Sequence, residues 1–312
     1  MKPLEESSDV LAKEYDAALF DLDGVIYVGQ ESVPGVIAVI NDVHRDYGMT
    51  LTYVTNNASR SPASVASHLS ELGLDATAKD VVTSAQAGAA VLATLVPQGS
   101  SIFVLGSRDL MAEVELVGLV PSQDVEVKHA GVIEGYWPDM PWRMLAQASK
   151  VLNTGVPWVA TNMDITIPTQ WGMAPGNGAM VNALALAVGR RPTAVAGKPE
   201  VPLMQQSIDR AKSQRPIVIG DRLDTDIQGA NNVGIDSLLV FSGVTTVRDL
   251  MNAEPELRPT YVAWDATGLA SAHQAVSIAD NVVSLNRWHV RNGELSGSGD
   301  ILDAIRVAIN TV

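Results

Sequence analysis

Short apolar runs alternate with longer amphipathic stretches along most of the chain. Residues 17–20 and 49–54 are apolar and β-branched runs of the length that is typical of buried strands. The segments 36–44 and 62–72 carry apolar residues at helical spacing, and the second begins with serine and proline, a favourable helix start. Because strand, loop and helix alternate, we expect a parallel sheet with right-handed crossovers, which is the architecture of the α/β fold class.

The same alternation continues toward the end of the chain. The block at about 83–175 contains no paired-acid motif and has enough elements to form a second α/β unit inserted into the first. The tail ends in a predicted amphipathic helix at 300–309. Further helices are predicted at 85–95, 108–117, 141–152, 179–188 and 202–211, and further strands at 101–105, 130–136, 158–161, 216–219, 236–241 and 259–263, with another strand end at 195–199.

Length and charge limit the classes of protein that fit. The 312 residues are enough for one large domain or two moderate ones, and their net charge of −14 argues against nucleic acid or an anionic membrane as a partner. The absence of cysteine excludes disulfide bonds and thiolate metal sites. No apolar stretch approaches a membrane span, and acidic residues interrupt the N-terminal region, so we expect a cytoplasmic protein without a signal peptide.

Two aspartates, Asp21 and Asp23, directly follow the first predicted strand, and Gly24 ends that strand in a turn. Open α/β sheets bind ligands at the carboxyl ends of their strands, which is where these side chains lie. Carboxylates this close repel each other unless a cation neutralises them. An isolated motif of this kind is more often a solvated turn, so its interpretation depends on the other residues at the same edge.

Three further polar motifs also follow predicted strands: Thr55-Asn56-Asn57, Lys198, and the segment 220–226, which reads GDRLDTD. If the four strands are neighbours, all four loops open on one edge of one sheet. That edge would combine carboxylates for a hard cation such as Mg²⁺, hydrogen-bond donors and an ammonium group, which together suit the transfer of a phosphoryl group. Each motif alone is better explained as a turn or a solvated loop; their occurrence together favours a functional site.

The ordered motifs DxDGV, TNN, GKP and GDRLDTDI resemble the haloacid dehalogenase (HAD) superfamily. The resemblance covers roughly residues 15–265 and is to the phosphatases with a C2-type cap (class IIA), which include NagD-like and 4-nitrophenylphosphatase-like proteins. It implies a Rossmann-like parallel-sheet core with an inserted α/β cap. The implied division is a discontinuous core at 15–82 and 176–270, a cap at 83–175 and a C-terminal extension at 271–312.

The resemblance also assigns roles to the acidic residues. Asp21 is expected to be the nucleophile that becomes an aspartyl phosphate. Asp23 is expected to protonate the leaving group and then activate water, and its backbone carbonyl is expected to bind Mg²⁺. Asp221 is implied as the remaining carboxylate ligand of the metal beside Asp21, with Asp226 in support.

The remaining motifs are implied to bind the phosphoryl group. Thr55 and Asn56 would contact its oxygens with Asn57 nearby, and Lys198 would pair with both Asp21 and the phosphoryl group. In the family, the loop that selects the substrate follows an ATNxD stretch, which here places the expected substrate contacts at 164–173.

These features predict a Mg²⁺-dependent phosphomonoesterase that acts on a small phosphorylated metabolite. Glycerol 3-phosphate or another small sugar or polyol phosphate is expected first, because the segments TNNASRS, VVTSAQ, GDRLDTDI and RPTY are most similar to glycerol-3-phosphate phosphatases of actinobacteria. Phosphoglycolate, pyridoxal phosphate and nucleotides stay open as substrates. A non-catalytic phosphate-binding regulatory protein is the alternative from another class. The sequence also leaves open whether the chain forms a homo-oligomer.

Overall fold

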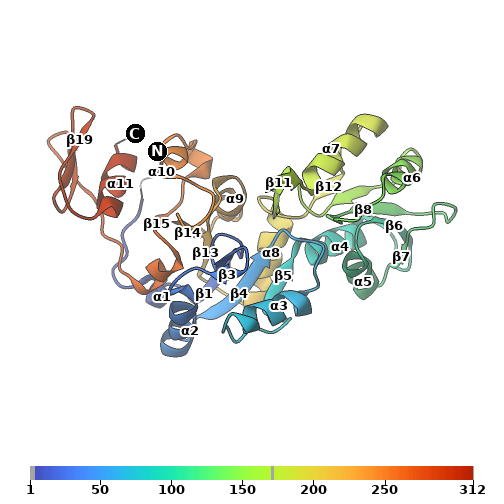
Figure 1. Ribbon diagram of the computed structural model, residues 1–312, viewed down its shortest axis with the longest axis horizontal. Helices are drawn as coiled ribbons and strands as arrows, with labels where there is room; N and C mark the ends of the chain where they lie inside the picture. Colours follow the sequence, from blue (N-terminus) through green and yellow to red (C-terminus); the bar gives the residue numbers. More distant parts are fainter. Residues whose placement is uncertain (1–3, 170–171, 312) are drawn as a thin grey trace. The chain divides into compact units, whose positions relative to one another are not determined.

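The structure is a computed structural model that describes residues 4–169 and 172–311. The chain forms two compact units, called unit 1 and unit 2 below (Figure 1). Unit 1 contains the described residues up to 53, residues 68–76 and the described residues from 207 onward; unit 2 contains residues 54–67 and the described residues of 77–206. The predicted cap at 83–175 lies within unit 2, and its boundaries stay a prediction.

Unit 1 is built around a parallel sheet, as the alternating pattern predicts. Ala17 pairs with Thr50 on one side and with Pro216 on the other, and Phe20 pairs with Tyr53 and Ile219. This register places the carboxyl ends of neighbouring strands at the same level. The strands, in the order β15-β14-β13-β1-β4, are β15 (Tyr261–Ala263), β14 (Asp236–Val240), β13 (Pro216–Gly220), β1 (Ala17–Phe20) and β4 (Thr50–Thr55), the last of which continues into unit 2.

The helix predicted at 36–44 forms in unit 1 and extends to Tyr47. In α2 (Val36–Tyr47), the buried residues Val36, Ile40 and Val43 recur at helical spacing, and Gly48 ends the helix with a φ of 69°. The other elements of this part of the chain are α1 (Leu11–Glu14), α3 (Pro62–Glu71, shared with unit 2), α9 (Gln228–Val233), α10 (Val247–Met251), the π-helical turn η1 (Leu223–Ile227), the 3₁₀ turns η2 (Pro255–Leu257) and η3 (Ala266–Ala270), and the hairpin strands β2 (Tyr27–Val28) and β3 (Glu31–Ser32).

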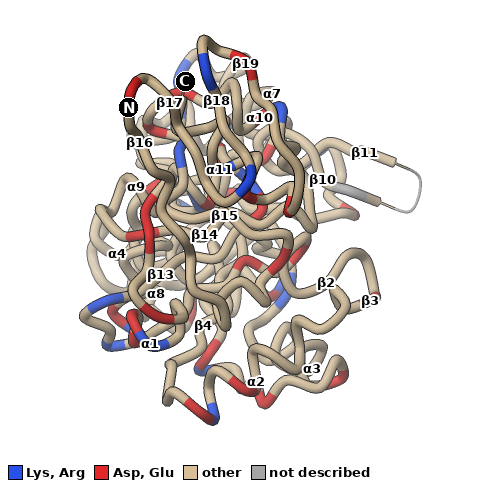
Figure 2. Tube along the Cα trace, turned by 90° about the vertical axis from the view of Figure 1, so that its left-hand side faces the viewer, with Lys and Arg blue, Asp and Glu red and all other residues tan. Residues whose placement is uncertain are grey.

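The C-terminal segment forms an antiparallel meander beside a helix, and the sequence pattern predicted only the helix. The strands β16 (Ser277–Ala279), β17 (Val282–Leu285), β18 (Trp288–Arg291) and β19 (Glu294–Ser296) pair in order, and α11 (Ile301–Ile309) lies beside them (Figures 1 and 2). Val307 of α11 packs with apolar residues of β17 and β18, while Leu302, Ile305 and Ile309 pack with Leu223 and Ile227 of η1. The extension therefore shares its core with the rest of unit 1.

Unit 2 contains a second parallel sheet with helices on both faces. Ile102 and Val104 of one strand pack with α4 and α5, whereas Phe103 and Leu105 pack with α6 and α7. The sheet order is β12 (Ala194–Val195), β9 (Trp158–Ala160), β8 (Gly131–Glu134), β6 (Ser101–Leu105) and β7 (Val120–Ser122). The other elements are α4 (Ser84–Leu95), α5 (Arg108–Leu116), α6 (Trp142–Leu152), α7 (Asn177–Val188), α8 (Val201–Ala211, shared with unit 1), β5 (Val81–Thr83), and the paired strands β10 (Thr166–Thr169) and β11 (Gly172–Pro175).

One expectation about strand neighbours is wrong. The strand that precedes Lys198 is β12, and it pairs with β9 in the sheet of unit 2 rather than with β1, β4 or β13. The four motifs therefore do not all follow strands of one sheet. Among the helices that the structure describes, none has the length and apolarity of a segment that crosses a bilayer.

Candidate active site

Three carboxylates meet at the carboxyl edge of the sheet in unit 1. Asp21 follows β1, Asp221 follows β13, and Asp226 lies on the π-helical turn η1. One oxygen from each of the three lies within 4.8 Å of the others, and Asp221 and Asp226 are buried. The in-register pair Phe20 and Ile219 explains this placement, because the backbone N–H of Asp21 also donates to the Ile219 carbonyl at 2.9 Å.

The Asp221 carboxylate is held by the backbone and framed by glycines. The Val244 N–H donates to its Oδ2 at 2.7 Å, and the Thr245 N–H donates to its carbonyl at 3.1 Å. A Cβ on Gly243 would lie 2.0 Å from Oδ2, and a Cβ on Gly24 would lie 2.5 Å from it. Gly24 also has a φ of +86°, so the glycine of the DxDG motif is required both for its turn and for the space that Asp221 occupies.

Asp226 is fixed in a similar way. The Arg222 N–H donates to its Oδ2 at 3.1 Å, and a Cβ on Gly220 would lie 2.1 Å from its Cβ. Asp224 belongs to the same turn but forms a salt bridge with the Arg222 guanidinium at 2.9 Å and is exposed. The turn thus directs Asp226 toward the carboxylates of Asp21 and Asp221, and it directs Asp224 into solvent.

Asp23 lies outside this group of carboxylates. Its side chain is exposed, and the turn that carries it is closed by the Gly24 N–H, which donates to the Tyr27 carbonyl at 2.7 Å. The three clustered carboxylates are oxygen ligands of the kind that Mg²⁺ prefers, and a divalent cation would offset their mutual repulsion.

The other predicted site residues form a hydrogen-bond network in unit 2. The Asn56 side chain contacts the backbone of Lys198 twice: its Oδ1 accepts from the Lys198 N–H at 2.8 Å, and its Nδ2 donates to the Lys198 carbonyl at 3.0 Å. The Lys198 ammonium donates to the Val54 carbonyl at 3.3 Å, and the lysine is buried. The structure therefore brings the TNN and GKP motifs together although they follow strands of different sheets.

Thr55 and Asn57 shape the loop after β4. The Asn57 N–H donates to Thr55 Oγ1 at 3.1 Å, and the Asn57 Oδ1 accepts from the backbone N–H and hydroxyl of Ser59, both at 2.8 Å. Thr55 is buried. These contacts are those of a compact polar turn.

Asp164 and Asn162 also belong to this hydrogen-bond network, which the sequence analysis did not predict. Asn56 Nδ2 also donates to both carboxylate oxygens of Asp164 at 3.2 Å, and Asn162 Nδ2 donates to the Asn56 carbonyl at 2.7 Å. Asp164 begins the segment that was expected to contact substrate. No spacing in the sequence indicates the contact, because Asn56 and Asp164 are 108 residues apart.

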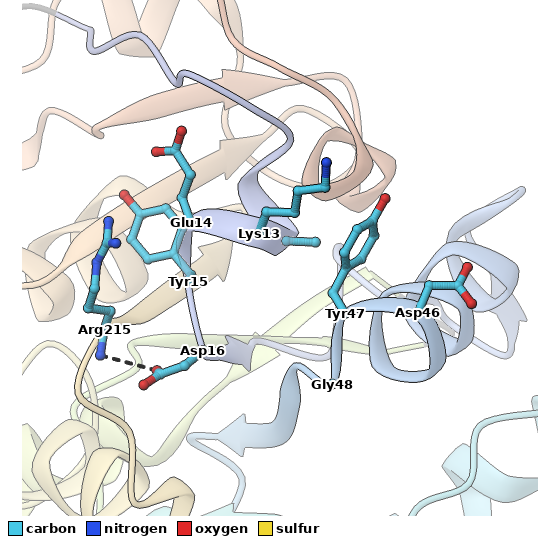
Figure 3. Close-up of a pocket in the computed structure, with 9 residues that line it drawn as sticks. Lys13, Glu14, Tyr15, Asp16, Asp46, Tyr47, Gly48 and Arg215 are labelled. Carbon is cyan, nitrogen blue, oxygen red and sulfur yellow. Dashed lines mark hydrogen bonds between the residues drawn. The ribbon is translucent and has the colours of Figure 1, made fainter.

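A separate hollow of about 580 Å³ lies at the opposite, amino-terminal ends of the strands in unit 1 (Figure 3). Asp16, just before β1, accepts hydrogen bonds from the backbone N–H groups of Gln214 and Arg215, and the Arg215 guanidinium lies 5.5 Å from the Tyr15 ring centre. Lys13 pairs with Asp9 at 2.8 Å. The hollow contains none of the predicted site residues, and Asp16 links the segments that precede β1 and β13.

Comparison with known proteins defines the class. Residues 18–120 match the haloacid dehalogenase-like hydrolase family, and residues 195–269 match a HAD-hydrolase-like family. The chain is 42% identical over 269 residues to D-glycerol 3-phosphate phosphatase of Mycobacterium tuberculosis, a match that covers 86% of this chain and 75% of that protein. The chain therefore belongs to the HAD-like hydrolases.

Individual relatives show which HAD-like hydrolases this chain is similar to. The crystal structure of the glycerol phosphate phosphatase of M. tuberculosis in complex with magnesium superimposes with a TM-score of 0.89 at 38% identity, covering 97% of this chain and 91% of that one. The 4-nitrophenylphosphatase of Thermotoga maritima superimposes with a TM-score of 0.77 at 28% identity, covering 83% and 98%. An acid sugar phosphatase of Staphylococcus aureus is 35% identical over 80% of this chain and 94% of its own length. The predictions of the family, of the fold class and of a hydrolase are confirmed.

Proposed function

We propose that this protein is a Mg²⁺-dependent phosphatase that hydrolyses small phosphate monoesters, with glycerol 3-phosphate as the first expected substrate. The observation that carries the proposal is the convergence of Asp21, Asp221 and Asp226 within 4.8 Å at the carboxyl edge of the sheet. The substrate is supported by the similarity to a D-glycerol 3-phosphate phosphatase over 86% of the chain, and an acid sugar phosphatase among the relatives supports the wider class.

The acidic residues would divide the work of two displacements. The Asp21 carboxylate attacks phosphorus, and the bond from phosphorus to the ester oxygen breaks while Asp23 gives that oxygen a proton. Water then attacks the aspartyl phosphate, Asp23 takes the water proton, and the bond from phosphorus to Asp21 breaks. Mg²⁺, when held by the carboxylates of Asp21 and Asp221 with Asp226 in support and by the Asp23 carbonyl, would neutralise charge on the phosphoryl oxygens.

The phosphoryl group would be bound by Thr55, Asn57, Lys198 and the backbone N–H of Asn56. For Asn56 we assign the backbone N–H because its side-chain amide already contacts Lys198 and Asp164. An ammonium group and backbone donors stabilise the negative charge that develops on phosphoryl oxygens during transfer. The pairing of Lys198 with Asp21 stays a prediction.

The test is a phosphate-release screen over small phosphate esters with and without Mg²⁺, scored by kcat/KM. We expect glycerol 3-phosphate to rank first, chelation of Mg²⁺ to stop release, and Asp21→Asn to lower kcat by roughly 10⁴-fold or more, because it removes the nucleophile. Asp224→Asn is the matched control, since Asp224 is an exposed aspartate near the carboxylate group.

Each contrary result identifies an alternative. Higher kcat/KM for phosphoglycolate, pyridoxal phosphate or a nucleotide would replace the substrate and keep the enzyme class. Binding of phosphate with no release from any ester would identify a non-catalytic phosphate-binding protein. Undiminished release by Asp21→Asn would remove the proposed mechanism.

A further inference from the structure

The amide of Asn56 can bind Lys198 in only one of its two orientations. Its Oδ1 accepts from the Lys198 N–H and its Nδ2 donates to the Lys198 carbonyl. A flipped amide would place a donor against the N–H and an acceptor against the carbonyl, so both bonds would be lost. Gly197 makes the close approach possible, because a Cβ there would lie 2.6 Å from Asn56 Oδ1.

Asp164 selects the productive orientation. Its two carboxylate oxygens lie 3.2 Å from Asn56 Nδ2, and an ionised carboxylate accepts hydrogen bonds but donates none. The two hydrogens of Nδ2 are thus directed to Asp164 and to the Lys198 carbonyl. Because hydrogen bonds to a charged group are stronger than neutral ones, Asp164 biases the amide toward the orientation that holds Lys198.

Asp164 is itself held by the start of α7. The Gly178 N–H donates to the Asp164 carbonyl at 2.9 Å, and Asn177 Nδ2 donates to the Asn162 carbonyl at 2.9 Å. A Cβ on Gly176 would lie 2.3 Å from the Asp164 carbonyl oxygen, so the two backbones meet where only glycine fits. Asn162 adds a second link from the same segment, because its Nδ2 donates to the Asn56 carbonyl.

We propose that Asp164 is a positioning residue for phosphate binding: through the Asn56 amide it fixes the backbone at Lys198 and hence the ammonium group that binds the phosphoryl group. The inference rests on the proposed function of Lys198. It replaces the expectation that Asp164 contacts the substrate, since its carboxylate faces Asn56. Residues 165–169 and 172–173 keep that expectation, and residues 170 and 171 of the same segment lie outside the described residues.

The test compares Asp164→Ala, Asp164→Asn and the control Asp139→Ala, an exposed aspartate of the same unit. Two quantities are measured: KM for several phosphate esters, and the inhibition constant of inorganic phosphate. We expect Asp164→Ala to raise all of them by the same factor, about tenfold, because a hydrogen bond to a charged group is lost and every ester shares the phosphoryl group. Asp164→Asn retains one acceptor oxygen and should recover part of the loss.

Two results would overturn the proposal. Unchanged KM and inhibition constants in Asp164→Ala would show that the contact positions nothing. A rise that differs between esters and spares inorganic phosphate would show that Asp164 contacts the substrate instead. A failure of the proposed function is distinguishable from both results, because it would remove phosphate release from the wild type and from every variant. Release by the wild type and by Asp164→Asn, with the same Mg²⁺ requirement, shows that the proposed function holds.

Discussion

The two units contribute different functional groups, carboxylates in unit 1 and an ammonium group with an amide in unit 2, and they position these groups by different means. Unit 1 gathers the carboxylates of Asp21, Asp221 and Asp226 by the register of neighbouring strands. Unit 2 gathers Asn56 and Lys198 by hydrogen bonds between side chains and backbone. If unit 1 carries the chemical steps and unit 2 the phosphate binding, substitutions in unit 1 should lower kcat or metal affinity, and substitutions in unit 2 should raise KM.

After the loss of kcat predicted for Asp21→Asn, the largest effect that sharpens this contrast is expected from Asp23→Asn. Asparagine keeps the shape of the side chain but transfers no proton, so kcat should fall by on the order of 10²–10⁴-fold while KM changes little. Steady-state kinetics with saturating Mg²⁺ measure both quantities, and Asp224→Asn serves as the control. A raised KM with an unchanged kcat would assign Asp23 to binding and break the contrast between the units.

A smaller effect is expected from Asp221→Asn. The Val244 N–H can still donate to the side-chain oxygen, so the loop should keep its shape, but one of the three clustered negative charges is lost. The Mg²⁺ concentration for half-maximal activity should rise by at least about tenfold. Calorimetric titration with Mg²⁺ alone checks the same loss without turnover, and equal affinity in wild type and variant would contradict the metal site.

The same contrast explains what the sequence predicts and what it does not. Asp21 and Asp221 could be placed together because both follow apolar runs, and parallel strands end at a common edge. The link between Asn56 and Asp164 depends on the orientation of one amide, which no local pattern records. Lys198 was placed correctly at a strand end but in the wrong sheet, because a strand of two residues carries little information about its neighbours.

The C-terminal meander was missed for a different reason. Its strands are three or four residues long and mostly exposed, so alternation of apolar and polar residues is weak. A local signal did exist: Asn292-Gly293 separates β18 from β19, and both residues have a positive φ. That pair is a strong indication of a two-residue hairpin turn. The helix α11 was predicted because its apolar residues recur over two full turns.

The units also differ in how a buried ionisable group responds to pH. In unit 1, burial lowers the pKa of His273 to about 4, so folding keeps this ring neutral and stability falls as the pH drops from about 6.5 toward 4. In unit 2, burial raises the pKa of Glu134 to about 8, although a hydrogen bond from the Trp158 indole opposes the rise. The folded state then holds a proton that the unfolded state releases above about pH 4.5, so stability falls as the pH rises toward 8.

The smallest predicted effect tests this difference through Glu134→Gln. Glutamine does not ionise and can still accept from Trp158 Nε1, so the variant should lose the part of the alkaline destabilisation that Glu134 causes. One proton is at most about 1.4 kcal/mol per pH unit, and a change of that size shifts the melting temperature by about 2 °C in a chain of this length. The melting temperature should therefore fall less steeply between pH 6 and 8 for Glu134→Gln than for wild type. The control is Glu115→Gln, at an exposed glutamate of the same unit, which should follow the wild type.

The slope of melting temperature against pH is the informative quantity, because the new amide can change stability equally at every pH. Parallel slopes for Glu134→Gln and wild type would mean that Glu134 is already ionised in the folded protein, and the two units would then not differ in the sign of their pH response.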